Sequence, residues 1–240
     1  MFLNRRILQA EYFDEPGRPD SELVEGYQLL ARMNQLFVLS RPFKHFLPRW
    51  LGAERCRKLS ILDIGGGDGS LGDELTVWAA GRGWDWQFTT LDLNARAMRT
   101  PGKRFVAGSA LALPFREGAF DVVVGSQMAH HLPDEAAVSR HFSEAWRVSR
   151  ELVFLNDVHR NVFLYAVVWL VMHLRRYPAH FRSDGLISVR RGWRVNEWRA
   201  LAANAGIPNA RVSIYAGARV MLHAVKGRSP VPIARSELGN

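Results

Sequence analysis

A run of glycines behind an acidic residue is the part of the chain best suited to bind a ligand. Residues 61–69 read Ile-Leu-Asp-Ile-Gly-Gly-Gly-Asp-Gly, so an apolar segment leads through Asp63 into a glycine turn. Glycines let a backbone turn tightly and approach a ligand without clashes from Cβ atoms. The helix expected to follow offers free N–H groups at its first turn. The stretch predicts a ligand-binding loop, with a plain tight turn as the alternative.

A second carboxylate narrows the class of ligand. Asp92 ends the next apolar segment, Thr-Thr-Leu-Asp, roughly 20 residues beyond the loop, where doubly wound folds place an acid that accepts hydrogen bonds from ribose hydroxyls. The ligand is therefore expected to be a nucleoside compound. A dinucleotide fingerprint, G-x-G-x-x-G/A, does not fit, because its third position falls on Ser70.

The spacing from Asp63 onward is instead D-x-G-x-G-x-G, which resembles the first motif of the class I S-adenosylmethionine-dependent methyltransferases. Three further landmarks of that family follow in order. They are the segment Gly-Ser-Ala-Leu-Ala-Leu-Pro-Phe at 108–115, the strand Phe-Asp-Val-Val at 120–123, and the turn Ser-Gln-Met-Ala-His-His-Leu at 126–132. The resemblance covers about residues 58–156 and implies S-adenosylmethionine as the cofactor.

The same resemblance implies which residues line the cofactor site. They are Asp63, Gly65, Gly66, Gly67, Asp92, Leu93, Ser109, Ala110, Leu111 and Gln127. One departs from the family pattern, because Ser109 stands where the family usually has an aspartate that accepts a hydrogen bond from the adenine amino group. A serine hydroxyl accepts such a bond without the help of a charge. Stacking or backbone contacts are then expected to hold part of the adenine.

Histidines and one carboxylate are the candidates for chemistry on the acceptor. His130 and His131 follow the fourth expected strand, and Asp157 ends the fifth at the same edge of the sheet. In similar small-molecule O-methyltransferases, the first histidine of the pair and this carboxylate face the substrate. We therefore predict His130 as a general base oriented by Asp157, with His159 as a second candidate. The alternative is that these histidines only support the turn and that alignment alone drives transfer.

The expected reaction is methylation of a hydroxyl, phenolic in kind, on a small hydrophobic acceptor. The order of motifs resembles bacterial methyltransferases of specialised, polyketide-type metabolism. The rival enzyme is a carbon- or nitrogen-methyltransferase on a quinone-like or natural-product ring, which would share every cofactor motif. The N/D-P-P-Y/F signature typical of nucleobase methylation is absent after the fourth strand. A third possibility is a non-catalytic, methyltransferase-like RNA-binding or scaffold protein, against which the intact glycine loop and Asp92 argue.

Charge and composition limit the remaining classes. The 240 residues carry a net charge of +9 and are 48% hydrophobic, which excludes an intrinsically disordered chain. Between Arg175 and Arg199, seven arginines face two acidic residues, so either an anionic partner or a solvated basic face is expected there. The single cysteine, Cys56, can form neither an intrachain disulfide nor, alone, a metal site. We expect a cytoplasmic protein with no signal peptide, no membrane span, no metal, no nucleic-acid partner and a possible homo-oligomer.

The elements that must position these residues alternate between short apolar strands and helices, which predicts a doubly wound α/β fold with a seven-stranded sheet, mostly parallel with an antiparallel final strand. The expected strands are Lys58–Ile64, Trp86–Leu93, Arg104–Ala107, Asp121–Gly125, Glu151–Asn156, Arg211–Tyr215 and Arg219–Val225. The expected helices are Ser70–Ala80, Ala95–Arg99, Asp134–Val148, 160–176 and Val195–Ala205.

The domain organisation follows from the same pattern. Residues 1–50 are expected to form an N-terminal helical cap, 51–227 the Rossmann-like domain with a helical insert at about 160–192, and 228–240 a flexible tail. The apolar insert and the N-terminal helices are expected to roof a pocket for an aromatic, lipidic or polyketide-like acceptor. A helix buried against the sheet or in a dimer is the alternative for the insert. The sequence leaves the acceptor and the oligomeric state open.

Overall fold

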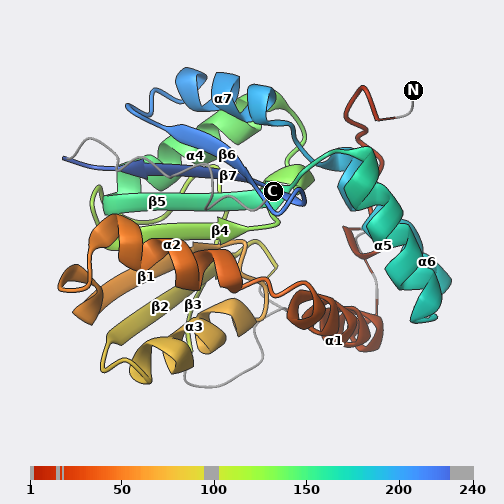
Figure 1. The fold of residues 1–240 in the computed structure, drawn as a ribbon, viewed down its shortest axis with the longest axis horizontal. Helices are drawn as coiled ribbons and strands as arrows, with labels where there is room; N and C mark the ends of the chain where they lie inside the picture. The colour runs from red at the N-terminus through yellow and green to blue at the C-terminus, as the bar shows by residue number, and fades with distance from the viewer. Residues whose placement is uncertain (1–2, 15–16, 18, 95–102, 228–240) are drawn as a thin grey trace.

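A seven-stranded sheet forms the centre of the molecule (Figure 1) in a computed structural model that describes residues 3–14, 17, 19–94 and 103–227. Its strand order is β3-β2-β1-β4-β5-β7-β6, and only β7 runs antiparallel to its neighbours. The strands are β1 Lys58–Ile64, β2 Asp85–Asp92, β3 Arg104–Ala107, β4 Phe120–Ser126, β5 Ser149–Val158, β6 Arg211–Tyr215 and β7 Arg219–Val225. The predicted fold class is thereby confirmed.

Apolar side chains project from both faces of the sheet. Ile61 and Leu62 are adjacent in β1 and both fully buried, yet they belong to different core clusters because neighbouring strand residues point to opposite faces. One cluster lies beneath α2 (Arg41–Leu51) and α3 (Ser70–Ala80). The other lies beneath α4 (Glu135–Val148) and α7 (Val195–Asn204). Helices on both faces explain why the central strands read as continuous apolar runs.

Three further helices stand at the edge where the parallel strands end (Figure 1). They are α1 (Asp20–Leu36), α5 (Val162–Leu174) and α6 (Ala179–Arg191). A separate apolar cluster joins them, with Met33 of α1, Val168 of α5 and Phe181 of α6 among its buried members. Short 3-10 turns complete the chain: η1 (Tyr12–Asp14), η2 (Arg55–Arg57) and η3 (Ala129–His131). The three helices form a side lobe beside the carboxyl edge of the sheet.

The structure differs from the predicted elements mainly in this side lobe. The sequence did not predict α6, whose buried residues are few and interrupted by charged ones such as Asp184 and Arg191. Two predicted segments, the helix at Ala95–Arg99 and the tail at 228–240, lie outside the described residues. The division into a cap, a central domain and an insert remains a prediction. No described helix is long and apolar enough to cross a membrane.

Candidate functional site

The glycine loop connects β1 to α3 in a conformation that a side chain would disturb. Gly65 and Gly67 have φ values of 69° and 54°, in the left-handed region that favours glycine. The Gly65 N–H donates to the carbonyl of Leu91 at 2.7 Å, which ties the loop to β2. A Cβ at Gly65 would lie 2.2 Å from Met128, and one at Gly66 would lie 2.5 Å from Asp63. The loop therefore forms a cradle with its backbone exposed to the cavity described below.

Asp92 lies at the end of β2 beside this loop. One carboxylate oxygen accepts the N–H of Gly67 at 2.9 Å, and the other accepts the N–H of Asn94 at 2.9 Å. Each carboxylate oxygen has a further lone pair, so both remain able to accept bonds from a ligand. The neighbouring Leu93 is 79% exposed. Asp92 thus holds the loop in shape and also presents an acceptor pair to the cavity.

Asp63 is the least satisfied group in the site. Both of its carboxylate oxygens are buried and lack a hydrogen-bond partner among the described residues. Burial, and after it the charges of Asp92 and Asp68, together raise the pKa of Asp63 to about 7. A positively charged ligand group beside these three acids would lower that pKa and favour the ionised form. The cradle therefore suits a cationic nucleoside better than a polyphosphate.

Residues from β3 and β4 complete this end of the site. The Ser109 hydroxyl accepts the N–H of Leu111 at 3.1 Å, so it caps the turn after β3. Gln127 has a φ of 54°, unusual for a residue with a side chain, and its N–H donates to Asn156 at 2.9 Å. Ala110 lies between the two turn residues and also faces the cavity. All of the predicted cofactor residues border one cavity.

This cavity has a volume of about 730 Å³ and extends from the glycine loop to the N-terminal segment and α1. Small-molecule sites usually measure about 300–1,000 Å³. Away from the glycine loop it is lined largely by apolar side chains from distant parts of the chain, namely Phe13, Leu30, Ala31, Leu39 and Leu132, and Met128 borders it beside Gly65. Tyr27 of α1 stands over the glycine loop, 3.4 Å from the Cβ that Gly67 lacks. The cavity therefore has a polar end and an apolar end.

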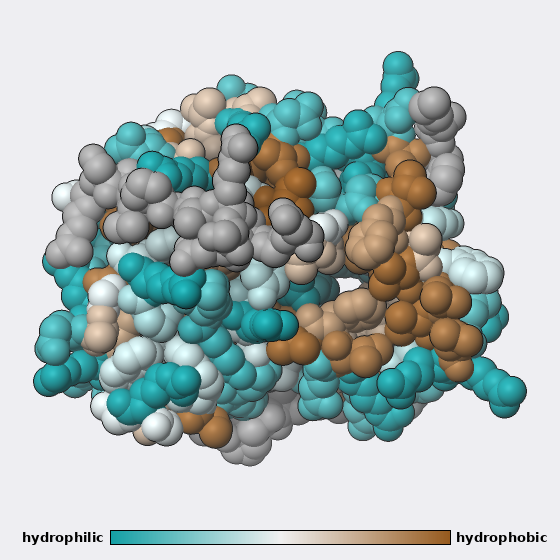
Figure 2. Space-filling model, viewed as in Figure 1, coloured by the Kyte–Doolittle hydropathy of each residue, from teal (hydrophilic) through white to brown (hydrophobic). Residues whose placement is uncertain are grey.

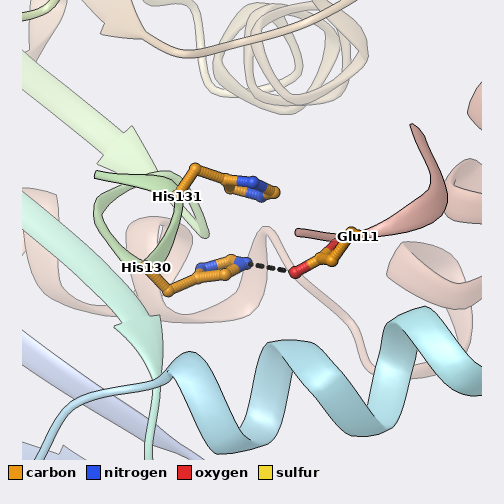
Figure 3. A group of neighbouring side chains, drawn as sticks. All are labelled: Glu11, His130 and His131. Carbon is orange, nitrogen blue, oxygen red and sulfur yellow. Dashed lines mark ion pairs between the residues drawn. The ribbon is translucent and has the colours of Figure 1, made fainter. Parts of the chain in front are cut away.

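A cluster of Glu11, His130 and His131 borders the apolar end (Figure 3). The Nδ1–H of His130 lies 2.6 Å from a carboxylate oxygen of Asp157, whose other oxygen accepts the backbone N–H of His130 at 2.7 Å. On the opposite side of the ring, Nε2 lies 3.6 Å from Glu11. His131 contacts Asp14 through Nδ1 at 3.0 Å. The structure thus brings the predicted pair, His130 and Asp157, into direct contact.

The charges around His130 determine its protonation. Burial alone would lower the pKa of its imidazole, but Asp157 and then Glu11 outweigh burial and raise the pKa to about 10. Two arginines, Arg6 and Arg191, donate to the backbone carbonyl of His130 and hold its turn in place. At neutral pH the ring therefore carries its proton and cannot accept another. The role of His130 as a general base remains a prediction, and a ring protonated at neutral pH argues against it.

His159 lies apart from this cluster. It is not among the residues that border the cavity, and its backbone forms an isolated bridge with Trp193. Its Nδ1 contacts the side-chain nitrogen of Asn161 at 2.8 Å, beside the carbonyl of Gly217. Burial lowers the pKa of His159, and Arg194 and Arg160 add to the decrease. The structure therefore places this second candidate base away from the cavity, where it supports the turn before α5.

The spacing of Glu11, His130 and His131 would also suit a metal ion, since their ligand atoms lie within 4.8 Å of one another. However, positively charged side chains already lie beside these residues. The Arg191 guanidinium lies 3.7 Å from Glu11 and 2.5 Å from Asp14. The protonated His130 ring supplies another cation, so the carboxylates are neutralised without a metal. We assign no ion to this cluster.

Two features of the site were not predicted from the sequence. Glu11 reaches His130 from the N-terminal segment, and no local pattern distinguishes it from any other surface acid. Arg191, one of the seven clustered arginines, has a side chain only 7% exposed and faces the site rather than solvent. Arg194 also turns inward, donating to the carbonyl of Leu3. Part of the predicted basic surface is therefore internal.

Comparisons of the sequence and of the fold with known proteins both find methyltransferases. Residues 62–154 match the family model described as a methyltransferase domain. A demethylmenaquinone methyltransferase from Roseiflexus castenholzii is 39% identical over 145 residues, which are 59% of this chain and 57% of the relative. An uncharacterized methyltransferase from a Mycobacterium species is 30% identical over 46% of this chain and 40% of the relative. The chain thus spans about half the length of the curated relatives it matches.

Among solved structures, human N-acetylserotonin methyltransferase in complex with S-adenosylmethionine has a TM-score of 0.59 at 16% identity. The similarity covers 88% of this chain and 57% of the human chain. At this identity the likeness concerns the fold. The family match and the shared fold support the predicted class I methyltransferase domain, whereas the resemblance to polyketide-type O-methyltransferases remains a prediction.

Proposed function

We propose that the protein transfers a methyl group from S-adenosylmethionine to a hydroxylated aromatic ring of a small, largely apolar acceptor. The observation that carries this proposal is one continuous cavity that joins the glycine loop and Asp92 to the cluster around His130. S-adenosylmethionine supplies an electrophilic methyl group on a positively charged sulfur when it is bound. It is the cofactor we expect, because the family match and the site both favour a cationic nucleoside.

The residues present fit this cofactor. The carboxylate of Asp92 is placed to accept ribose hydroxyls, and the loop at Gly65 and Gly67 leaves room for a close backbone approach. The unpartnered carboxylate of Asp63 attracts positive charge to the same end of the cavity. Ser109 keeps a lone pair for the adenine amino group while its other contact, to Leu111, caps the turn. Leu93, Ala110 and Gln127 border the same end.

The acceptor end of the cavity suits an aromatic ring with a hydroxyl. Phe13, Leu30 and Met128 supply apolar contact, and His130 supplies a fixed positive charge. A phenol ionises near pH 10 in water, and a neighbouring positive charge lowers its pKa. We therefore propose that His130, held by Asp157, stabilises the ionised oxygen rather than removing its proton, and that the hydroxyl proton passes to solvent before the methyl group is transferred.

A ring carbon is the second candidate acceptor atom. The relatives from Roseiflexus are named demethylmenaquinone methyltransferases, which favours a quinone-like ring. An ionised hydroxyl makes the adjacent ring carbon nucleophilic as well as the oxygen. The same positive charge at His130 would therefore serve either product, and the orientation of the ring in the cavity would decide between them.

Product analysis tests the proposal. The protein is incubated with methyl-labelled S-adenosylmethionine and a panel of phenols and reduced naphthoquinones, and products are identified by mass spectrometry and NMR. We expect a labelled methyl ether or a labelled ring methyl group. Absence of both, together with a salt-sensitive RNA shift and no cofactor turnover, would favour the non-catalytic scaffold instead.

The role of His130 is tested with the acceptor that turns over. His130→Ala should lower kcat by about 10²–10³-fold at neutral pH, as loss of one preorganised charge does elsewhere. Activity should return as the pH approaches the pKa of the phenol. His45→Ala on α2, outside the cavity lining, is the matched control and should leave kcat unchanged. An unaltered pH profile for His130→Ala would show that alignment alone drives transfer.

A further inference from the structure

Helix α5 has an apolar outer surface that the described part of the chain does not cover. Its members are 48% to 73% exposed, and we refer to them as the α5 apolar face: Val162, Phe163, Trp169, Leu170 and Leu174. Val162 and Trp169 are seven residues apart, as are Phe163 and Leu170, and Leu174 follows Leu170 by four, so the five lie along one broad side of the helix. Figure 2 shows apolar residues gathered on this side of the molecule, over α5 and the neighbouring α1. An apolar surface of this kind commonly marks an interaction site.

The opposite side of α5 already does the packing that the fold requires. Leu164, Val168 and Met172 are buried against α1 and α6. The helix contains no Asp, Glu, Lys or Arg in its 13 residues. A helix that faced only its own core and water would be expected to show polar residues outward. Packing among the described residues therefore does not explain the α5 apolar face.

The charged residues that follow this face in the sequence have one sign. From Asn161 to Ser183 the chain holds three arginines and no aspartate or glutamate. Arg175 and Arg176 are exposed directly after the last turn of α5, and Arg182 follows on α6. Within the part of the chain that the structure describes, none of the three has an ion-pair partner. Exposed aromatic and aliphatic side chains bordered by arginines match the surface of an anionic bilayer.

We propose that the α5 apolar face docks onto an anionic lipid bilayer, with α5 lying in the plane of the interface. None of the described helices is long and apolar enough to span a membrane, so the contact would be peripheral. A second copy of the chain fits less well. A helix face about 20 Å long and 10 Å wide offers roughly 200 Å². Stable protein–protein interfaces bury about 800 Å² on each partner, which is far more.

Docking in this orientation would bring the bilayer near the mouth of the cavity. Leu30 on α1 is 42% exposed and also borders the cavity, and Leu36 on the same helix is exposed as well. Buried residues of α1 and α5 share one apolar cluster, which fixes the two helices beside each other. If the proposed function holds, an acceptor dissolved in lipid would enter along this apolar route. Bilayer binding itself does not depend on that function.

Co-sedimentation with vesicles tests the docking surface. The full chain is mixed with vesicles of phosphatidylcholine alone, or of phosphatidylcholine with phosphatidylglycerol, at low and high salt. Trp169→Gln combined with Leu170→Gln removes part of the apolar face, and Arg175→Gln combined with Arg176→Gln removes the charge. Val77→Gln on α3 is the matched control, because Val77 is 74% exposed on a helix far from α5 (Figure 1).

We expect the parent and Val77→Gln to bind the phosphatidylglycerol vesicles equally. The apolar double variant should bind about tenfold more weakly or worse, and the arginine variant should lose the preference for phosphatidylglycerol. Parent that does not sediment with these vesicles, or an apolar variant that binds like the parent, would overturn the proposal. A dimer in sedimentation equilibrium that Trp169→Gln and Leu170→Gln dissociate would assign the face to a second copy instead. Cofactor binding, measured calorimetrically, verifies that each variant is folded.

Discussion

Replacing Asp92 with alanine should weaken binding of S-adenosylmethionine and of its demethylated product without unfolding the protein. The carboxylate is placed to accept two ribose hydroxyls while it holds the N–H of Gly67 at 2.9 Å. Hydrogen bonds to a charged group contribute about 1.5–3 kcal/mol each. Since the two hydroxyls regain water in the free ligand and the bonds share one carboxylate, we expect a loss of about 2–4 kcal/mol in total. That corresponds to a dissociation constant about 30-fold to 1,000-fold higher.

Calorimetric titration with the demethylated product measures this effect without turnover. Asp92→Asn keeps one acceptor oxygen, enough for Gly67 or for one hydroxyl, so its affinity should lie between those of the parent and Asp92→Ala. Asp85→Ala is the matched control, because Asp85 begins the same strand at its other end and its carboxylate accepts a bond from the neighbouring Gln87 side chain. Equal affinity of Asp92→Ala and the parent would refute the assignment of Asp92 to the cofactor site.

Three further substitutions have expected outcomes. Gly65→Ala puts a Cβ 2.2 Å from the Met128 side chain, at a position whose backbone is in the left-handed conformation. It should lower the free energy of unfolding by about 1–3 kcal/mol more than Gly83→Ala, where only the backbone conformation is unfavourable. Chemical denaturation measures both variants. Ser109→Asp should leave cofactor affinity equal or higher by calorimetry, because it adds charge near the adenine amino group while an aspartate can still cap the turn. The folded pKa of His130 is raised to about 10, so the stability from its ion pair is complete below its unfolded value near 6.5 and is lost as the pH rises through 10. The melting temperature of the parent should therefore fall over that range, and Asp157→Asn should flatten the decrease.

Each contrary result would change the interpretation of one residue. Equal destabilisation of the two glycine variants would mean that Met128 moves aside at little cost. A large loss of affinity in Ser109→Asp would place the adenine elsewhere in the cavity. A parent whose stability is constant between pH 6.5 and 10 would indicate that His130 is neutral, which would restore it as a candidate general base.

The sheet and the cofactor end were predictable because their signals are local. Three consecutive valines, Val122 to Val124, read as a buried strand, and β4 has them all fully buried. The contact between His130 and Asp157 follows from topology, since β4 and β5 are parallel neighbours with Ser126 opposite Asn156. Residues that follow the ends of adjacent parallel strands meet at one edge of the sheet.

The side lobe was less predictable for a physical reason. Helix α6 buries Asp184 and Arg191 among apolar residues, because both side chains bond to the N-terminal segment rather than to water. A hydrophobic pattern read from the sequence counts such residues as exposed and loses the helix. The same long-range contacts bring Glu11 to His130, and neither partner carries a local mark of the other.

The two ends of the cavity are therefore built from different structural features. The cofactor end is made by backbone turns of fixed spacing, all within or next to the matched residues 62–154. At the acceptor end, Glu11, Phe13, Leu30 and Leu39 lie outside that match, whereas His130, His131 and Leu132 lie within it. Substitutions there change the shape offered to the acceptor without altering the glycine loop or Asp92. A glycine loop within the matched residues is thus compatible with different acceptors, and the N-terminal segment and α1 hold residues that would distinguish them.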